Sequence, residues 1–176
     1  MPESTLLSEL IAVAAKRAPH AAALTFGAQS LSYVELLAAI DRFAAGAVGL
    51  GLQRGERVAI YLEKRFEAVV ASFGVAAAGA VFVPLNPLLK PEQVAFIMKD
   101  CDVRVLITSP ERLALLAEVL GHCDALRAVV ITGADPVRSP LPTPLSVSTW
   151  DALLTAVPGP RQIGRASCRE RVCLAV

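Results

Sequence analysis

The stretch RVAIYLEKRFEAVVASFGVAAAGAVFVPL, residues 57–85, contains two kinds of hydrophobic pattern in succession. Its ends, RVAIYL and AVFVPL, are short apolar runs rich in β-branched residues, which are typical of strands buried on both faces of a sheet. Residues 66–78 between them are rich in alanine and predict a helix, and Gly79 predicts a tight turn before the second strand. This order predicts a parallel α/β sheet in which residues 80–85 form a central strand.

The alternation extends toward the amino terminus. Residues 5–17 predict a helix. Residues 21–26 and 29–32 predict a short hairpin, with Gly27 between its strands.

A capping box marks the start of the next helix. Ser32 has the N-cap side chain, and Glu35 lies three positions later, where its carboxylate can reach back to the Ser32 backbone. Apolar residues then recur at helical spacing until Gly49 and Gly51 end the helix. These apolar residues are Leu36, Leu37, Ile40, Phe43, Ala44 and Ala47.

Further helices and strands follow the quoted stretch. Residues 91–99 predict a helix that begins at Pro91. Proline is tolerated in the first turn of a helix, where its missing N–H costs little. Residues 103–108 and 127–132 are apolar and predict two more strands, separated by a helix from about 111 to 120. The fold class predicted from these elements is α/β, with a mostly parallel sheet flanked by helices.

The regular pattern ends after the last of these strands. Residues 133–148 contain four prolines and predict an exposed loop. Residues 150–156 predict a short helical turn, and no element is predicted after Pro158. A chain of 176 residues is long enough for one domain with a core and too short for two of ordinary size.

The uncharged run from Ala68 to Leu89 is long enough to cross a membrane. Two glycines, two prolines and an asparagine interrupt it, so a helix, a turn and a buried strand explain it better. The amino terminus has acidic residues before its apolar run and no basic leader, so it does not resemble a signal peptide. We therefore expect no membrane span and a cytoplasmic location.

The cysteines and histidines do not have the spacing of a metal site. The chain has no CxxC pair, and its two histidines are far apart, which favours ordinary surface or helix-end positions for both. Free thiols in a reducing compartment are the simpler interpretation. The residues concerned are Cys101, Cys123, Cys168, Cys173, His20 and His122.

The last sixteen residues, RQIGRASCRERVCLAV, differ in composition from the rest of the chain. They contain four arginines against one glutamate and show no helical or strand period. Without them the chain has 13 basic and 15 acidic residues, a net charge of −2, so no basic surface for nucleic acid is expected.

Residues 163–172 can be encoded by ATC GGA AGA GCG TCG TGT AGG GAA AGA GTG, which resembles a widely used short-read sequencing adapter in one frame. We therefore expect residues 161–176 to be a non-native tail and residues 1–160 to be the part that belongs to the protein. A basic functional tail is the alternative.

The sequence contains no known motif of a phosphate-binding loop. Neither GxGxxG after a strand nor GxxxxGK followed by Ser or Thr occurs, and no lysine follows Lys99. The glycine groups present, in GAVGLGLQRG and AAGAV, end helices and are expected to reverse the chain. No catalytic, cofactor-binding or metal-ligating residue is assigned from the sequence.

Several landmarks occur in the order found in a known family. Residues 31–108 resemble the opening of the AMP-forming acyl-CoA synthetases of the adenylate-forming ligase superfamily, and the similarity covers roughly residues 5–157. The matching residues are Ser32-Tyr33, Glu35-Leu36, Gly51, Gly55-Glu56-Arg57-Val58, Ala78-Gly79-Ala80 and Val83-Pro84-Leu85-Asn86-Pro87. The resemblance implies a truncated N-terminal part of the large domain of these ligases.

The resemblance implies that a carboxylic acid substrate attacks the α-phosphate of ATP, with magnesium, to give an acyl-adenylate and pyrophosphate. The thiol of coenzyme A then displaces AMP. In the family the reacting groups are held by a Ser/Thr/Gly-rich loop ending Pro-Lys-Gly, by later acidic motifs and by a lysine of a C-terminal domain. This chain has none of these, so we expect an inactive fragment whose ATP, magnesium and coenzyme A belong to the full-length parent.

Two positions point to different substrate classes. Leu62-Glu63-Lys64 is similar to amino-acid-activating adenylation domains, whereas Asn86 is more usual among acyl ligases. The stretches EKRFEAVVASFG and VPLNPLLKPEQV together resemble most the acyl-CoA ligases of exosortase loci. The alternatives are an amino-acid-activating fragment, or a small non-catalytic α/β module that binds a nucleotide or a partner and has a closing helix after its last strand.

Overall fold

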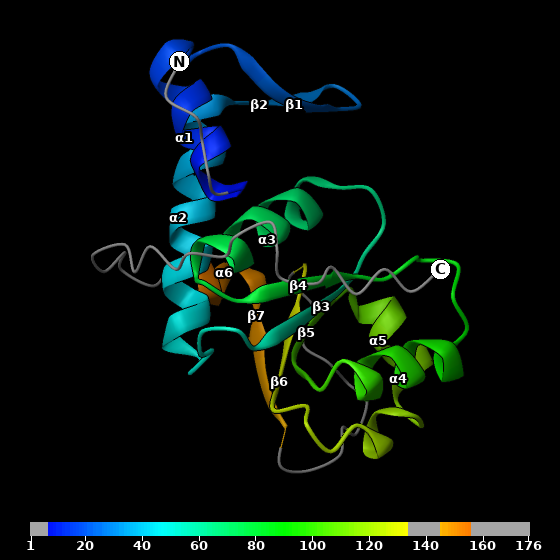
Figure 1. The fold of residues 1–176 in the computed structure, drawn as a ribbon. Coiled ribbons are helices and arrows are strands. Elements are labelled where there is room, and N and C mark those ends of the chain that lie inside the picture. Colours follow the sequence, from blue (N-terminus) through cyan, green and yellow to red (C-terminus); the bar gives the residue numbers. More distant parts are fainter. Residues whose placement is uncertain (1–6, 134–144, 156–176) are drawn as a thin grey trace.

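The computed structural model describes residues 7–133 and 145–155, which form a parallel sheet between helices and a hairpin that stands apart from it (Figure 1). The sheet has the strand order β4-β3-β5-β6-β7, and every neighbouring pair is parallel. The strands are β3 Arg57–Tyr61, β4 Val81–Pro84, β5 Val103–Thr108, β6 Ala128–Ile131 and β7 Ser146–Thr149. The predicted α/β class with a parallel sheet is confirmed.

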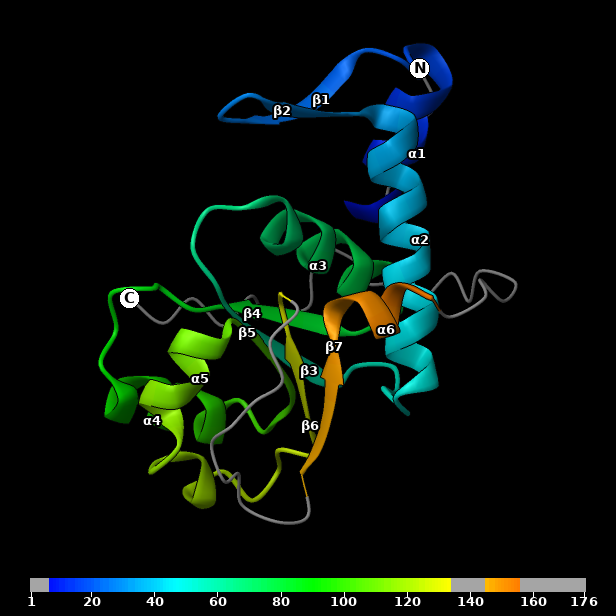
Figure 2. The same cartoon turned by 180° about the vertical axis from the view of Figure 1, so that it is seen from behind.

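Helices cover both faces of this sheet (Figure 2). One face packs on α2 Tyr33–Gly49, α3 Phe66–Ala77 and α6 Trp150–Leu154. The other packs on α4 Pro91–Asp100, α5 Pro110–Leu116 and the short 3-10 helix η1 Leu120–His122. Helix α1 Leu7–Arg17 lies outside these layers, against α2 and α3.

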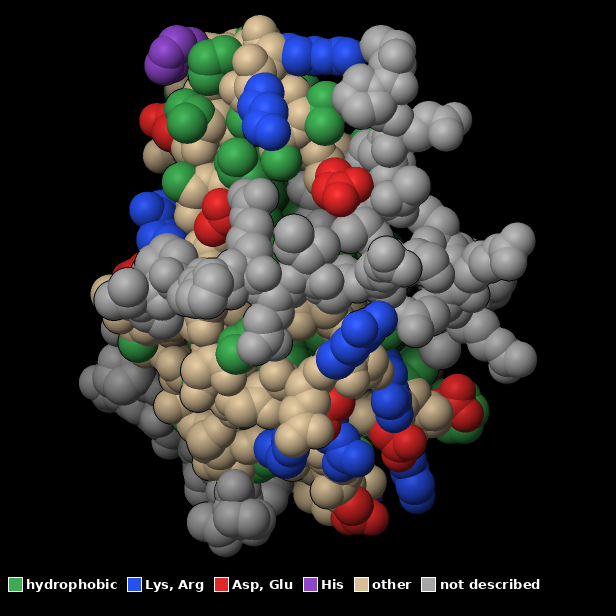
Figure 3. All heavy atoms as spheres, turned by 60° about the vertical axis from the view of Figure 1, so that its left-hand side comes forward, with side chains coloured by type: hydrophobic (Ala, Val, Ile, Leu, Met, Phe, Trp, Pro, Cys, Tyr) green, Lys and Arg blue, Asp and Glu red, His purple; other side chains and the backbone are tan. Residues whose placement is uncertain are grey.

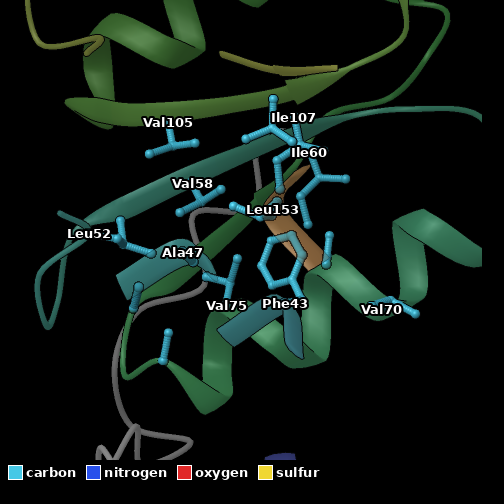
Figure 4. Packing of buried hydrophobic residues seen from close by; sticks show 14 of the residues in the cluster. Phe43, Ala47, Leu52, Val58, Ile60, Val70, Val75, Val105, Ile107 and Leu153 are labelled. Carbon is cyan, nitrogen blue, oxygen red and sulfur yellow. The ribbon is translucent and has the colours of Figure 1, made fainter. Parts of the chain in front are cut away.

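Alternation along the strands explains the two layers of core. In β3, Val58 and Ile60 belong to the cluster with α2, whereas Ala59 and Tyr61 belong to the cluster with α4. Figure 4 shows the first cluster, in which Phe43 lies among side chains of the sheet and of α3. Phe43 is 1% exposed, so truncating it to alanine would cost about 3–5 kcal/mol.

The amino-terminal elements agree with the sequence patterns. Strands β1 Ala22–Phe26 and β2 Gln29–Ser32 form the predicted antiparallel hairpin. Ser32 caps α2: its backbone N–H donates to the Glu35 carboxylate at 2.8 Å, and the Glu35 N–H donates to the Ser32 hydroxyl at 3.5 Å. The capping box is therefore confirmed, and α2 ends at the predicted Gly49.

The uncharged run from Ala68 to Leu89 divides into a helix, a turn and a strand, as predicted. Helix α3 ends at Ala77, Gly79 adopts φ +79° in the turn, and β4 begins at Val81. A positive φ is strained for other residues, which explains a glycine at this turn. None of the helices in the described part of the chain has the length and apolarity needed to cross a membrane.

The prediction that residues 80–85 form a central strand is wrong, because β4 lies at the edge of the sheet as described. Only Val83 of this strand is buried, and Pro84 is exposed, as proline usually is at an edge. An apolar, β-branched pattern indicates that helices bury the faces of a strand. It does not show whether the strand has a neighbour on one side or on both.

The loop predicted over residues 133–148 is also corrected. Its last residues belong to β7, which pairs in parallel with β6 and leads into α6 at Trp150. The four prolines precede β7 and lie outside the described residues. The helix predicted from 111 to 120 is shorter, because α5 ends at Leu116, yet Leu120 stays buried through the 3-10 turn.

Candidate functional site

Ligands in α/β sheets collect at the carboxyl ends of the strands, and buried polar side chains of this protein gather there. Thr108 ends β5, Ser109 follows it, and Thr132 follows β6. In the described part of the chain these three are the only buried polar residues, with 0%, 8% and 1% exposure. This edge of the sheet is therefore the candidate site.

Hydrogen bonds connect the ends of three adjacent strands. The Thr108 hydroxyl donates to the Tyr61 carbonyl at 3.1 Å, and the Thr132 hydroxyl donates to the Thr108 carbonyl at 3.4 Å. From the loop after β3, Arg65 Nη1 donates to Thr132 Oγ1 at 3.2 Å, and Arg65 Nε donates to Glu67 Oε2 at 3.1 Å. The guanidinium of Arg65 is therefore held by partners within the chain.

Arg112 fixes the loops after β3 and β4. Its Nη2 lies 2.8 Å from Glu63 Oε1, and its Nη1 donates to the Pro87 carbonyl at 2.7 Å. The guanidinium carbon lies 4.8 Å from the centre of the Tyr61 ring, and the Tyr61 hydroxyl donates to the Leu89 carbonyl at 3.0 Å. With its side chain only 14% exposed, Arg112 acts as a positioning residue for both loops.

The start of α5 carries a stabilising carboxylate. Ser109 caps this helix by accepting a hydrogen bond from the Arg112 N–H at 3.4 Å. A hydrogen bond with the Ser109 side chain lowers the pKa of Glu111 below its usual value. The carboxylate therefore stays charged in the first turn, where the helix dipole favours a negative charge.

The two positions that bear on substrate class are exposed. Among the described residues Lys64 forms no ion pair. Asn86 accepts a hydrogen bond from the Leu88 N–H at 2.9 Å, which closes a local turn. An aspartate could accept the same bond, so the geometry at Asn86 does not distinguish the two substrate classes.

A groove of about 620 Å³ lies next to this edge, beneath the hairpin. Three aromatic residues contribute to its lining: Phe26 of β1, Phe66 of α3 and Trp150 of α6. The charged residues of the lining are Glu63, Lys64, Arg65, Glu67 and Asp151. The rings of Phe26 and Phe66 are 6.4 Å apart in an edge-to-face arrangement. The lining of the groove therefore combines aromatic and aliphatic side chains with charged ones.

The candidate metal ligands are dispersed. Within residues 7–133 and 145–155, no group of three or more His, Cys, Asp or Glu side chains could hold a metal ion. His20 is exposed, and His122 lies exposed in the last turn of η1, as predicted for surface or helix-end residues. Cys101 and Cys123 are buried free thiols, and burial raises the pKa of Cys123. Cys168 and Cys173 lie outside the described residues.

The surface that the structure describes mixes charges of both signs. On the face shown in Figure 3, Lys and Arg side chains are interspersed with Asp and Glu. At the other end of the sheet Glu56 pairs with Arg104 at 3.7 Å and with Arg127 at 2.5 Å. These pairs link the amino ends of β3, β5 and β6, so we assign them a structural role in the sheet.

The sequence patterns assigned no residue to this site, and they missed the network of Arg65, Thr108 and Thr132. One local signal was present, because β5 and the stretch containing β6 both end in Ile-Thr. A threonine at the end of an apolar strand can bond to a neighbouring carbonyl without leaving the sheet. The contribution of Arg65 had no comparable signal.

A model of the family described as AMP-binding enzyme matches residues 11–163. The chain is 36% identical over 127 residues to N-(5-amino-5-carboxypentanoyl)-L-cysteinyl-D-valine synthase of Streptomyces clavuligerus, covering 70% of this chain and 16% of that protein. It is also 36% identical over 115 residues to a long-chain-fatty-acid–CoA ligase of Mycobacterium bovis, covering 64% of this chain and 19% of the ligase.

The fold is similar to that of solved CoA ligases. The crystal structure of the anthranilate CoA ligase AuaEII with anthranoyl-AMP matches with a TM-score of 0.78 and 24% identity, over 90% of this chain and 29% of that one. At this identity the likeness shows the fold alone. The chain thus spans less than a third of each of these relatives, which include both acyl-CoA ligases and peptide synthetases.

Proposed function

The chain belongs to the AMP-binding enzyme family, and we propose that it is part of an ATP-dependent, AMP-forming acyl-CoA ligase. The family match over residues 11–163 carries this proposal. In the proposed reaction a carboxylate displaces pyrophosphate from ATP to form an acyl-adenylate, and the thiol of coenzyme A then displaces AMP to form a thioester. We also propose a cytoplasmic location and a role in fatty acid metabolism.

The described residues show no preformed site for the triphosphate or magnesium. Every buried side-chain nitrogen and oxygen among them has a hydrogen-bond partner, so no unsatisfied buried polar group marks a ligand site. The described residues also contain no cluster of three or more His, Cys, Asp or Glu side chains that could hold a metal ion. The role we propose for this region is therefore structural: Arg65, Arg112 and the buried threonines hold the loops at the carboxyl edge of the sheet.

An acyl substrate is our preference over an amino acid. Asn86 and the stretches EKRFEAVVASFG and VPLNPLLKPEQV support it, as does the match to a long-chain-fatty-acid–CoA ligase. On the same stretches we propose the exosortase-associated subtype. The second candidate is an amino-acid-activating adenylation domain, which Lys64 and the 36% identity to the Streptomyces synthase favour.

ATP–pyrophosphate exchange tests the proposal. The intact gene, recovered by long-read sequencing, would be expressed and assayed with a panel of fatty acids, aryl acids and amino acids. We expect exchange with an acyl acid and formation of its CoA thioester. Exchange with amino acids only would overturn the substrate preference, and no exchange with any acid would overturn the ligase assignment.

The present chain of 176 residues is the matched control. We expect it to give no exchange with any acid, because its sequence lacks the Ser/Thr/Gly-rich loop ending Pro-Lys-Gly that holds reacting groups in the family. A small non-catalytic module that binds a nucleotide would instead show ATP binding by this chain, measured by equilibrium dialysis.

A further inference from the structure

We propose that Arg112 couples the two loops of the candidate site, so that a change in the loop after β3 is transmitted to the loop after β4. The first loop is residues 62–65, between β3 and α3, and the second loop is residues 85–90, between β4 and α4. Every contact that carries the coupling lies in the described residues, so the coupling does not depend on the proposed function.

The Arg112 side chain bonds to one group in each loop. Its Nη2 lies 2.8 Å from Glu63 Oε1 in the first loop, and its Nη1 donates to the Pro87 carbonyl in the second loop at 2.7 Å. A guanidinium is a planar, rigid fork, so the direction of one of these bonds fixes the direction of the other. A shift of Glu63 therefore disturbs the bond to Pro87.

The guanidinium is also held from the core. It lies over the buried ring of Tyr61 at 4.8 Å, and the Tyr61 hydroxyl donates to the Leu89 carbonyl at 3.0 Å. The backbone of Arg112 lies in the first turn of α5, which Ser109 caps directly after β5. Arg112 and Tyr61 together therefore connect the second loop to the sheet at two carbonyls.

Glu63 is the end of the coupling that can be released. Its side chain is 74% exposed, whereas that of Arg112 is 14% exposed. An exposed carboxylate exchanges an ion pair for water at small cost. Loss of the pair frees Nη2 while Nη1 still holds the Pro87 carbonyl, so the second loop is expected to respond whenever Glu63 moves.

The other arginine of the first loop does not supply this coupling. Arg65 bonds to Thr132 and pairs with Glu67, and both partners lie outside the second loop. The strand ladder is the competing path, because the Leu85 N–H donates to the Ile60 carbonyl at 2.9 Å. An experiment must therefore separate transmission through Arg112 from transmission through the backbone.

The coupling bears on what the edge of the sheet can do. Lys64 follows Glu63, Asn86 precedes Pro87, and the side chains of Lys64 and Asn86 are both exposed. A ligand that engages one of these side chains and shifts its loop would therefore change the position of the other. Arg112 is in this sense a positioning residue for both.

Hydrogen exchange of single amides, measured by NMR on the chain of 176 residues, tests the coupling. The reporters in the second loop are the N–H groups of Leu88 and Leu89, which donate to Asn86 Oδ1 at 2.9 Å and to the Asn86 carbonyl at 3.1 Å. Glu63→Ala removes the acceptor in the first loop. Lys64→Ala is the matched control, because Lys64 is an exposed neighbour that forms no ion pair among the described residues.

We expect Glu63→Ala to raise the exchange rates of both reporters by at least ~3-fold, because the second loop opens more often. The buried amides of Val129 and Val130 in β6 report global unfolding and should change less. An unchanged rate at both reporters would overturn the proposal. A uniform increase at all four amides would also overturn it, because it would indicate a global loss of stability.

The control must behave differently from Glu63→Ala. Lys64→Ala should leave the exchange rates of the reporters within ~1.5-fold, as expected for a surface substitution. An increase equal to that of Glu63→Ala would overturn the proposal, because any change in the first loop would then have the same effect.

A second variant separates the two paths. Arg112→Lys keeps a positive charge but loses the fork that reaches both loops. In an Arg112→Lys background, we expect Glu63→Ala to change the exchange rates of the reporters by less than ~1.5-fold, because the coupling is already lost. An undiminished effect of Glu63→Ala in this background would show that the backbone of β3 and β4 carries the change, and the role proposed for Arg112 would be wrong.

Discussion

Arg65 and Thr132 are joined by a hydrogen bond of 3.2 Å, although they lie 67 positions apart in the sequence. This bond crosses the end of β5 and links the loop after β3 to the residue that follows β6. Because Thr132 also donates to the Thr108 carbonyl, one buried hydroxyl orders three strand ends. The carboxyl edge of the sheet is therefore organised by side chains as well as by the strand ladder.

Removing this hydroxyl should weaken the edge. We expect Thr132→Val to lower the free energy of unfolding by about 1–2 kcal/mol, since Arg65 loses one acceptor and can turn to solvent. Urea denaturation followed by Trp150 fluorescence would measure the change. Thr25→Val, at an exposed hairpin threonine, is the control and should change stability by less than about 0.5 kcal/mol. Equal effects would contradict the role given to Thr132.

Helices α2 and α6 approach each other at Gly46. A Cβ on Gly46 would clash with the backbone carbonyl of Leu153, which cannot move without displacing α6. We expect Gly46→Ala to destabilise the protein by about 2 kcal/mol or more, measured as a shift in the urea midpoint. Gly49→Ala is the matched control in the same helix, because a Cβ there meets no atom within 4 Å. It should be neutral or stabilising by up to about 1 kcal/mol. A stabilised Gly46→Ala variant would refute this packing.

The capping box gives a pH dependence. Two hydrogen bonds lower the pKa of Glu35: the larger effect comes from the Ser32 side chain and the smaller one from the Ser32 backbone. A group whose folded pKa lies below its unfolded value of 4.5 stabilises the fold above that pH and loses the contribution as pH falls through the folded pKa. Glu35→Gln keeps an acceptor but does not titrate. We expect it to have a lower Tm than the unsubstituted chain at pH 7 and a similar Tm at pH 3. An unchanged difference in Tm at both pH values would contradict this mechanism.

Local patterns predicted most of the fold for physical reasons. The Ser32 cap, the Gly79 turn and the apolar runs of β3, β5 and β6 each depend on residues close in sequence. The order of the strands across the sheet did not follow from such patterns. An edge strand such as β4 and an inner strand such as β3 can both be apolar, since helices bury their faces.

The corrections to the position of β4 and to the predicted loop have the same cause as the missed network. Residues 146–148 were predicted as loop because prolines precede them, but pairing with β6 makes them part of strand β7. The contact of Arg65 with Thr132 likewise exists only once β3, β5 and β6 lie side by side. Interactions between distant segments leave no periodic signal in the chain. The exposed position of Lys64 could not be derived from its neighbours either.

The last prediction concerns RQIGRASCRERVCLAV, the tail over residues 161–176. We propose that it is not native, because ten consecutive residues, 163–172, agree with one fixed adapter-like DNA string. The family match covers residues 11–163 and therefore includes only the first three residues of this tail. We expect long-read sequencing of the locus to replace these residues with a reading frame that continues into a Ser/Thr/Gly-rich loop ending Pro-Lys-Gly. If residues 163–172 persist in genomic DNA and a natural stop codon follows, the tail is genuine, and a short non-catalytic module becomes the better description of the protein.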